Sequence, residues 1–416
     1  MCPHGRTSSL RRCSTSERRS LRYLLVELSP SGGLFQFSHQ LGSNLARQGH
    51  HVELITGRRP ELAPAVPGFT VNGCLPTWHP GPADVEPMRL RRARRPIRAV
   101  RHIVALATLV RHVRRQRPDV VMWHSTRFPM DAWALLLAHR VGPGVVYTTV
   151  MHETRPLAEQ RRSGSLYRSD PILMRSIRSS MRVLDVIFVL GDGARRDLIE
   201  RWQPQAHVEV IPHGDEDVFL TGREVPAVAT TQQHVLFFGT WIRHKGLDVL
   251  LDAFAKVRSA VPEATLTIAG AVGGDVDYES IRARAAEVGH VTLRPGYVPI
   301  AEVAGLFGRA RVVAVPYRRA NQSGVVHLAQ TFGRPVVATA VGDIPAVVRD
   351  GITGRVIPPG DVSSLAAGLQ ELLLDPETAD RLGREGRRRL ESQASWADIA
   401  SRVNAAVMRR AEPSEA

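Results

Sequence analysis

Short apolar runs alternate with longer segments in which apolar residues recur at the helical period along nearly the whole chain. The first half predicts six buried strands, at Tyr23–Leu28, Val52–Thr56, Val120–Trp123, Val145–Val150, Val186–Leu190 and Val208–Ile211. The second half predicts six more, at Val235–Phe238, Leu266–Ala269, Val291–Leu293, Val312–Val315, Val336–Thr339 and Val356–Ile357. Strands that alternate with helices of about 10–15 residues are typical of parallel α/β sheets rather than sandwiches or helix bundles. We therefore expect an α/β fold.

An aperiodic segment that begins at Pro212-His213-Gly214 separates the two series of strands. The chain has 416 residues, of which 43% are apolar, and this is enough for two domains with separate cores. We expect a disordered basic tail, an N-terminal α/β domain, a linker, a C-terminal α/β domain, and a final helix with its tail. Their respective boundaries are 1–20, 21–212, 213–233, 234–394 and 395–416.

The composition argues against several classes of protein. Three cysteines, Cys2, Cys13 and Cys74, form no CxxC pair, which argues against a disulfide framework and against a zinc site. No apolar run approaches the ~20 residues that span a bilayer, and residues 1–20 lack the apolar segment of a secretion signal. We expect a cytoplasmic protein without a metal site.

The formal charge of +15 is partly concentrated between Arg89 and Arg117, where eleven arginines surround a helix-like stretch. Apolar residues follow the helical period there, at Ile97, Val100, Ile103, Val104, Ala107, Val110 and Val113. One interpretation is peripheral contact of residues 89–117 with an anionic membrane, at the inner face. The other is a core-facing helix with a solvated arginine face. Nucleic acid is not an expected partner, because no aromatic residues interleave the arginines.

Lys245 is one of only two lysines in a chain with 53 arginines. It follows the predicted strand Val235–Phe238 and the strand-breaking Gly239, and it precedes a segment of helical periodicity. At such a strand-to-helix turn, anionic ligands meet backbone N–H groups and the positive end of a helix dipole. Lys245 is therefore a candidate phosphate contact, with a solvated cation as the alternative. Lys256 resembles an ordinary exposed helix residue.

A second turn of this kind follows the strand that ends at Val315. Ser323 suits the N-cap of a helix predicted from about Val325 to Phe332, and Gly324 allows a ligand to approach the free N–H groups of the first turn. The two turns together could clamp one diphosphate, although capping alone also selects a Ser-Gly pair before a helix.

Two features of the first half place further candidates at strand ends. Gly32 and Gly33 form a tight turn after the first predicted strand, where they permit close approach by a ligand. His152 follows the strand Val145–Val150 and so should point from its carboxyl end. A lone histidine is more often structural than catalytic, so His152 gains weight mainly from its position.

Several motifs occur in the order and spacing of family 4 glycosyltransferases, and the chain resembles that family from about Tyr23 to Arg409. They are Gly32-Gly33, Gly49-His50-His51-Val52, the segment from Gly239 to Gly246, Gly333-Arg334-Pro335-Val336-Val337-Ala338-Thr339 with Gly342, and Ser395-Trp396 before a helix. The resemblance implies a GT-B fold, in which two Rossmann-like domains with parallel sheets face a central cleft and the last helix crosses back to the first domain. It also implies a nucleotide-diphosphate sugar as donor substrate, transfer with retention, and neither metal nor cofactor.

The resemblance also assigns roles to individual residues. Lys245 matches the lysine that contacts the donor diphosphate, Gly32 and Gly33 match the loop facing that phosphate, and His152 matches a histidine near the donor sugar. With Arg243, His152 and Lys245 form the candidate catalytic set, and Glu153 is a weaker candidate for positioning the acceptor. The expected donor-binding residues are Gly32, Gly33, Gly239, Thr240, Gln322, Ser323, Gly324 and Val325.

The chain departs from the family pattern at three positions. Thr240 stands where an arginine is common, although Arg243 could reach the same phosphates. The paired glutamates that ordinarily hold the donor sugar and ribose fall on Ala320 and Leu328 when Gly333-Arg334-Pro335 anchors the comparison. We therefore interpret the chain as a variant in which Gln322, Ser323 and backbone amides serve the donor.

The expected function is transfer of a sugar to a glycan, lipid-linked or small-molecule acceptor in polysaccharide, glycolipid or glycosylated-metabolite biosynthesis. The basic segment 89–117 favours a lipid-linked acceptor. One alternative is a catalytically degenerate GT-B protein that binds sugar nucleotides or a partner, which the missing glutamates would favour. A nicotinamide-dependent oxidoreductase is remote, because no strand is followed by G-x-G-x-x-G with an acidic residue about 20 positions later.

Overall fold

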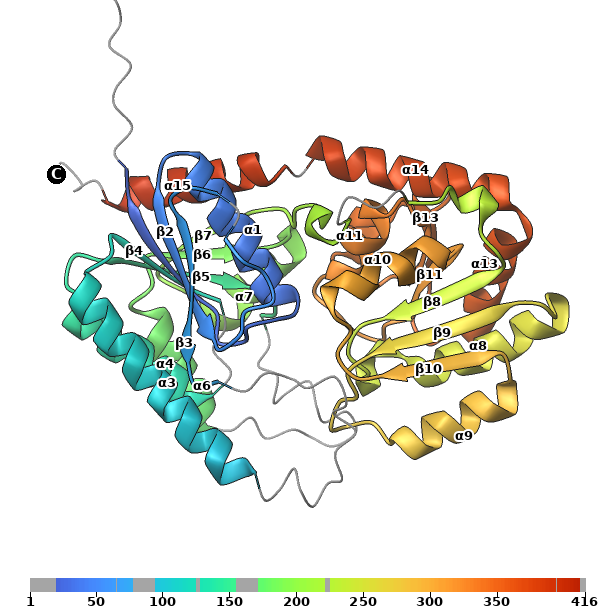
Figure 1. Cartoon of the computed structure of the whole chain (residues 1–416), viewed down its shortest axis with the longest axis horizontal. Helices are drawn as coiled ribbons and strands as arrows, with labels where there is room; N and C mark the ends of the chain where they lie inside the picture. Colours follow the sequence, from blue (N-terminus) through green and yellow to red (C-terminus); the bar gives the residue numbers. More distant parts are fainter. Residues whose placement is uncertain are drawn as a thin grey trace, which may run out of the picture.

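The computed structural model describes residues 20–64, 66–77, 94–124, 128–154, 171–220, 225–393 and 395–411. These residues form two Rossmann-like α/β units that lie beside one another (Figure 1). Most of the predicted tail 1–20, residues 89–93 of the basic segment, and part of the predicted linker lie outside the described residues.

The first sheet has seven parallel strands in the order β3-β2-β1-β4-β5-β6-β7. Its strands are β1 (Arg22–Val26), β2 (His51–Gly57), β3 (Phe69–Leu75), β4 (Val120–Trp123), β5 (Val146–Met151), β6 (Val186–Val189) and β7 (His207–Val210). Its helices are α1 (Gly33–Arg47), α3 (Arg95–Gln116), α4 (Pro129–Val141), α6 (Pro171–Met181) and α7 (Asp192–Trp202). One core lies between the sheet and α1 with the last helix, α15 (Trp396–Ala411), and a second lies between the sheet and α3, α4, α6 and α7.

The second sheet has six parallel strands in the order β10-β9-β8-β11-β12-β13. Its strands are β8 (His234–Phe238), β9 (Thr265–Gly270), β10 (Val291–Pro295), β11 (Val312–Val315), β12 (Val336–Thr339) and β13 (Gly354–Ile357). Its helices are η3 (Arg243–Lys245), α8 (Leu247–Ala260), α9 (Tyr278–Val288), α10 (Ile300–Arg309), α11 (Gly324–Thr331), α12 (Ile344–Val347), α13 (Val362–Leu374) and α14 (Pro376–Gln393). Two short 3-10 turns, η1 (Asp217–Phe219) and η2 (Val228–Thr230), lie between β7 and β8.

All twelve predicted strands are present, with bounds that differ by at most two residues at either end. The structure adds β3, which the apolar pattern did not predict. This strand lies at the edge of the first sheet, and Asn72 and Gly73 interrupt its apolar residues. An edge strand that is only partly buried needs few apolar side chains, so its sequence gives a weak signal.

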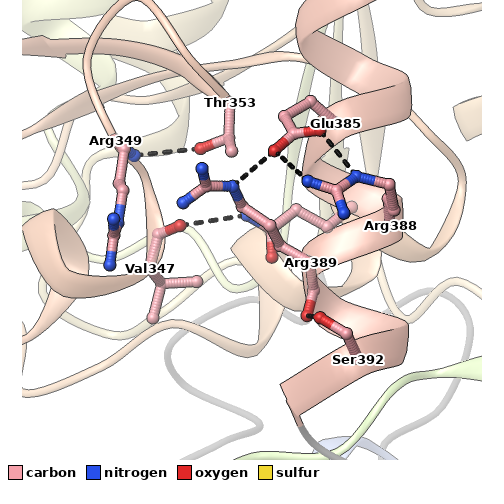
Figure 2. Close-up of polar contacts among 8 residues, drawn as sticks. Val347, Arg349, Thr353, Glu385, Arg388, Arg389 and Ser392 are labelled. Atoms are coloured by element: carbon pink, nitrogen blue, oxygen red, sulfur yellow. Dashed lines mark hydrogen bonds and ion pairs between the residues drawn. The ribbon is translucent and has the colours of Figure 1, made fainter.

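The chain returns to the first domain through α14 and α15 (Trp396–Ala411), which run along the same side of both domains (Figure 1). Figure 2 shows contacts in the second half of α14, where Glu385 accepts hydrogen bonds from Arg388 and Arg389. Buried residues of α15, among them Trp396, belong to the same core cluster as α1 and β1. The last helix is therefore part of the first domain's core.

The basic helix α3 does not bury the apolar residues that the sequence pattern singled out in its first half. Ile97, Val100, Ile103 and Val104 have 47–60% of their surface exposed. The buried residues are instead Ala105, Leu106, Leu109 and Val113, which contact the sheet through the second half of the helix. The interpretation of this stretch as an ordinary core-facing helix is therefore wrong for its N-terminal half.

Candidate functional site

The carboxyl ends of the two sheets face one another, and the loops that follow the strands meet between the domains. The loop after β5 contacts the loop after β11, because the Asn321 side chain donates a hydrogen bond to the Thr154 hydroxyl at 2.8 Å. On one side, Tyr297 after β10 donates to Glu61 after β2 at 2.6 Å. Loops of this kind carry the binding residues in open α/β sheets.

Lys245 ends η3, directly between β8 and α8, as the sequence predicted for its position. Its Nζ donates to the Tyr317 hydroxyl at 2.7 Å and lies 3.9 Å from the centre of the Tyr317 ring. Gly246 turns the chain with φ 68°, and a Cβ there would collide with the carbonyl oxygen of Pro316. Within the described part of the chain no carboxylate pairs with Lys245. Tyr317 therefore positions the Lys245 ammonium group without neutralising its charge, so the group can bind an anion.

The second predicted turn lies directly beside the first. Ser323 occupies the N-cap of α11, as predicted, but its side chain caps no backbone N–H. Its hydroxyl instead donates to the Tyr317 hydroxyl at 3.4 Å. A Cβ built at Gly239 would lie 3.6 Å from the Val325 side chain, so the end of β8 approaches the start of α11. Lys245, Ser323 and the first turn of α11 therefore meet around one buried tyrosine.

The remaining predicted donor residues lie around this cluster with fewer contacts. Thr240 is exposed, and Gln322 is partly buried, with an Oε1 atom that has no hydrogen-bond partner. The Arg243 side chain lines a neighbouring pocket of about 740 Å³, together with His244, Arg318 and Asp275. The structure thus places Arg243 on the pocket side of η3 rather than in the Tyr317 cluster.

The first domain contributes Gly32, Gly33 and His152. Gly32 has φ 88° at the N-cap of α1, and a Cβ at either glycine would meet no atom within 4 Å. His152 follows β5, packs edge-on against Phe37 at 4.9 Å between ring centres, and leaves Nε2 buried without a partner. Burial, followed by the neighbouring His124 and His213, lowers the pKa of His152 well below its ordinary value. At neutral pH the ring is therefore an uncharged imidazole. Glu153, beside it, is partly buried.

Three further residues at this boundary were missed by the sequence reasoning. His124 follows β4, is 2% exposed, and has two ring nitrogens without partners, while burial lowers its pKa to about 3. His213 after β7 stacks on His327 of α11 at 4.5 Å between ring centres, which joins the two domains. The strand-end rule that selected His152 would also have selected His124. His327 carried no such signal, because it lies inside an apolar helix.

The positions of the family's paired glutamates cannot bind a sugar through side-chain carboxylates. Leu328 is 4% exposed and belongs to the core of the second domain, and Ala320 has no polar side chain. Among the described residues, no three His, Cys, Asp or Glu side chains gather as metal ligands. None of the helices described has the length and hydropathy to span a membrane.

Two family models match the chain. One, described as Glycosyltransferase Family 4, matches residues 31–215, and the other, described as Glycosyl transferases group 1, matches residues 232–375. Together they cover most of both domains and leave out residues 1–30 with β1, residues 216–231, and the last two helices.

Named relatives match across most of the chain. A D-inositol 3-phosphate glycosyltransferase of Arthrobacter sp. (strain FB24) is 28% identical over 88% of this chain and 89% of its own length. A GDP-mannose-dependent alpha-(1-6)-phosphatidylinositol monomannoside mannosyltransferase of Mycolicibacterium smegmatis is 28% identical over 59% of this chain and 68% of its own length. The structure of HepE from Anabaena in complex with UDP and glucose aligns with a TM-score of 0.66 and 14% identity, covering 93% of this chain and 99% of HepE.

Proposed function

The chain belongs to the family 4 glycosyltransferases of GT-B fold, and from this premise we propose that Lys245 and the first turn of α11 bind the diphosphate of its nucleotide-sugar donor. The observation that carries the proposal is the cluster around Tyr317. It presents one ammonium group that has no carboxylate partner among the described residues, beside a helix N-terminus whose N-cap side chain forms no capping hydrogen bond. A pyrophosphate would supply the missing anion to both.

The chemistry of transfer explains why these groups matter. The bond between the sugar's anomeric carbon and the diphosphate breaks, and its electron pair goes to the departing phosphate oxygen. The acceptor hydroxyl forms the new bond on the same face, and its proton passes to the departing diphosphate oxygen. Charge grows on the diphosphate in the transition state, so a fixed cation and N–H groups there lower the barrier without a metal or cofactor. The pyrophosphate is common to the UDP of HepE and the GDP-mannose named for the mannosyltransferase.

We propose that neutral groups take over the recognition of the donor sugar. Gln322 Oε1 and His152 Nε2 are buried and have no hydrogen-bond partner in the part of the chain that the structure describes, and they belong to the two loops that the Asn321–Thr154 hydrogen bond connects. A buried polar atom without a partner costs about 1–3 kcal/mol, which a sugar hydroxyl would recover on binding. Glu153 remains our candidate for positioning the acceptor.

An exposed apolar and basic surface supports a lipid-linked acceptor. Eight of the eleven large hydrophobic side chains exposed in the described chain lie on α3, on α6, or on α4 with its N-cap residue. They are Ile97, Val100, Ile103, Val104, Phe128, Trp133, Leu137 and Ile172. These helices pack in series along one side of the first domain (Figure 1). Their single carboxylate, Asp131, is buried against His102, whereas seven of their arginines are exposed.

Such a face suits an anionic membrane, because apolar side chains enter the interface while arginines meet the lipid phosphates. We propose that this surface docks the enzyme at the inner face of the cytoplasmic membrane and brings it to its acceptor. We propose no nucleic-acid partner for this surface.

The donor site is tested by thermal shift with nucleoside diphosphates and their sugars, without metal, followed by turnover of the sugar that binds. A shift with one nucleotide that disappears in Lys245→Ala is the expected result. Absence of any shift and any turnover in folded protein would refute the donor proposal and favour a degenerate GT-B protein.

The membrane surface is tested by cosedimentation with vesicles of phosphatidylglycerol and phosphatidylcholine. Replacing Val100 and Ile103 together by serine should weaken binding about tenfold or more, since each buried CH₂ contributes ~0.8 kcal/mol. Ile352→Ser is the matched control, because Ile352 is 40% exposed on the second domain. Equal binding by all three proteins, or equal binding to vesicles of phosphatidylcholine alone, would contradict docking through this face.

A further inference from the structure

Two carboxylate side chains accept hydrogen bonds across the domain boundary, each from backbone N–H groups at the N-terminus of a helix in the other domain. Glu61, which follows β2, accepts the backbone N–H of Ile300 at the start of α10 through Oε1 at 3.0 Å. Asp343, which follows β12, accepts the N–H groups of Gly193 and Ala194 in the first turn of α7, at 2.9 and 3.1 Å. Each domain therefore supplies a carboxylate to a helix of the other.

Neither helix has a cap of its own. The N-cap of α7 is Gly191 and that of α10 is Pro299, and no side chain of their own turns accepts a hydrogen bond from these helices. The first N–H groups of a helix need partners, and a carboxylate is the most favourable one because it also meets the positive end of the helix dipole. Separation of the domains would leave both helix starts to water.

The α7 contact is closely fitted. A Cβ at Gly191 or at Gly193 would collide with the Asp343 carboxylate, so only glycines at these positions allow its approach. The loop that carries Asp343 is also held within its own domain, because the Asp343 N–H donates a hydrogen bond to the Asn321 carbonyl at 2.7 Å. Asn321 in turn donates to Thr154 of the first domain.

The Glu61 contact reaches the glycine turn at the start of α1. Glu61 Oε2 accepts from the Tyr297 hydroxyl at 2.6 Å and from Gln36 Nε2 in the first turns of α1 at 3.2 Å. Tyr297 also interacts with Ser31 and with the backbone of Gly32. This contact therefore sets the position of the Gly32–Gly33 turn relative to the second domain.

The two contacts lie on opposite sides of the Lys245 cluster. Glu61 connects the loop after β2 with the segment after β10, and Asp343 connects the loop after β12 with the helix after β6. Lys245 and Tyr317 instead follow the central strands β8 and β11 of the second sheet. A donor bound at the cluster would lie between them.

We propose that Glu61 and Asp343 are positioning residues, which latch the two domains in the arrangement that brings the Gly32–Gly33 turn and His152 over the donor diphosphate. The inference rests on the proposed donor site for its link to catalysis, whereas its link to domain closure stands on the contacts alone. Loss of a latch lowers the closed fraction, and activity falls in proportion because only the closed enzyme reacts.

The experiment compares Glu61→Ala, Asp343→Ala and the double variant with Asp361→Ala. Asp361 is the matched control, since it caps α13 by accepting from Ser363 and Ser364 within one domain. Each latch variant should lower kcat/KM about tenfold and the double variant about a hundredfold. Ligand-free small-angle scattering should give each latch variant a larger radius of gyration. Asp361→Ala should change thermal stability alone.

Conservative variants separate latching from folding. Asp343→Asn keeps one acceptor for the helix and should retain most of the closure, so its activity should lie between Asp343→Ala and the wild type. Latch variants whose radius of gyration and kcat/KM equal those of the wild type would overturn the inference, as would loss of activity without change in scattering. If the wild type turned over no donor, the proposed function would fail, yet an increased radius in both alanine variants would still support the latch.

Discussion

Replacement of Lys245 by alanine is the most discriminating perturbation of the donor site. Lys245 Nζ is held 2.7 Å from the Tyr317 hydroxyl, and no carboxylate in the described chain shares its charge. A phosphate placed about 4 Å from this ammonium would gain about 4 kcal/mol at the effective dielectric constant of about 20 typical of such positions. Part of that energy already stabilises the bound donor, and the part that grows with the departing charge accelerates transfer.

We expect Lys245→Ala to lower kcat by about 10²–10³, or about 2.7–4 kcal/mol, the effect of removing one fixed donor from a developing oxyanion. Lys256→Ala is the matched control. Its Nζ donates to Ser363 at 2.9 Å on the exposed surface of α8, so its activity should stay within about twofold of the wild type. Lys245→Arg should recover little, because the larger guanidinium spreads its charge over a plane and does not place a compact point charge where Nζ lies, 2.7 Å from the Tyr317 hydroxyl.

The assay follows release of the nucleoside diphosphate under saturating donor and acceptor, with kcat and KM measured separately. Tyr317→Phe provides an internal check, because it removes the hydroxyl that orients Lys245 but keeps the ring and the charge. Its loss should be smaller than that of Lys245→Ala. The reasoning is refuted if both lysine variants keep near-normal kcat in a wild type that turns over the donor.

Two further predictions concern stability. Gly246→Ala should destabilise the fold by about 1–3 kcal/mol, because φ is 68° there and the new Cβ would collide with Pro316. Gly305→Ala is the contrasting variant, because Gly305 lies within α10 and a Cβ there would meet no atom within 4 Å. Urea unfolding should show that it stabilises the fold by about 0.5–1 kcal/mol. Burial raises the pKa of Glu216 from 4.5 to about 8, so the folded state holds this proton more tightly than the unfolded state. Stability should therefore fall as pH rises from about 4.5 to 8, and Glu216→Gln should remove that part of the slope; an unchanged difference between the two proteins across this range would contradict it.

Much of the fold could be predicted from the sequence because parallel strands buried on both faces give unbroken apolar runs. Val120–Trp123, Val312–Val315 and Val336–Thr339 have the bounds that the pattern predicted. The helix α3 shows the limit of periodicity, which identifies an apolar stripe but not what covers it. In its second half the sheet covers Leu109 and Val113, and in its first half Val100 is exposed to solvent.

The candidate site could be predicted in part, because residues that follow buried strands gather at one edge of a parallel sheet. That rule placed Lys245, Ser323 and His152 at the domain boundary, and the structure brings the first two together through Tyr317. The rule gives no information about pairing between domains. Neither Glu61 nor Asp343 has a sequence signal, because its partner is a backbone N–H about 150 or more residues away.

Polar groups without a local hydrogen-bond partner nevertheless indicate where the fold or a ligand must supply one. Gly191 and Pro299 cannot cap the helices that they precede, and in the folded protein the opposite domain supplies each missing acceptor. The same argument applies to polar atoms that the described chain leaves buried and unpaired, at Gln322 Oε1 and His152 Nε2. Both atoms lie in loops that face the other domain, and position 328 of α11 carries leucine rather than a carboxylate. We therefore propose that the donor sugar forms hydrogen bonds with these two atoms. Gln322→Ala should therefore change the ratio of kcat/KM between donors that differ in one hydroxyl, whereas Lys245→Ala should lower both alike.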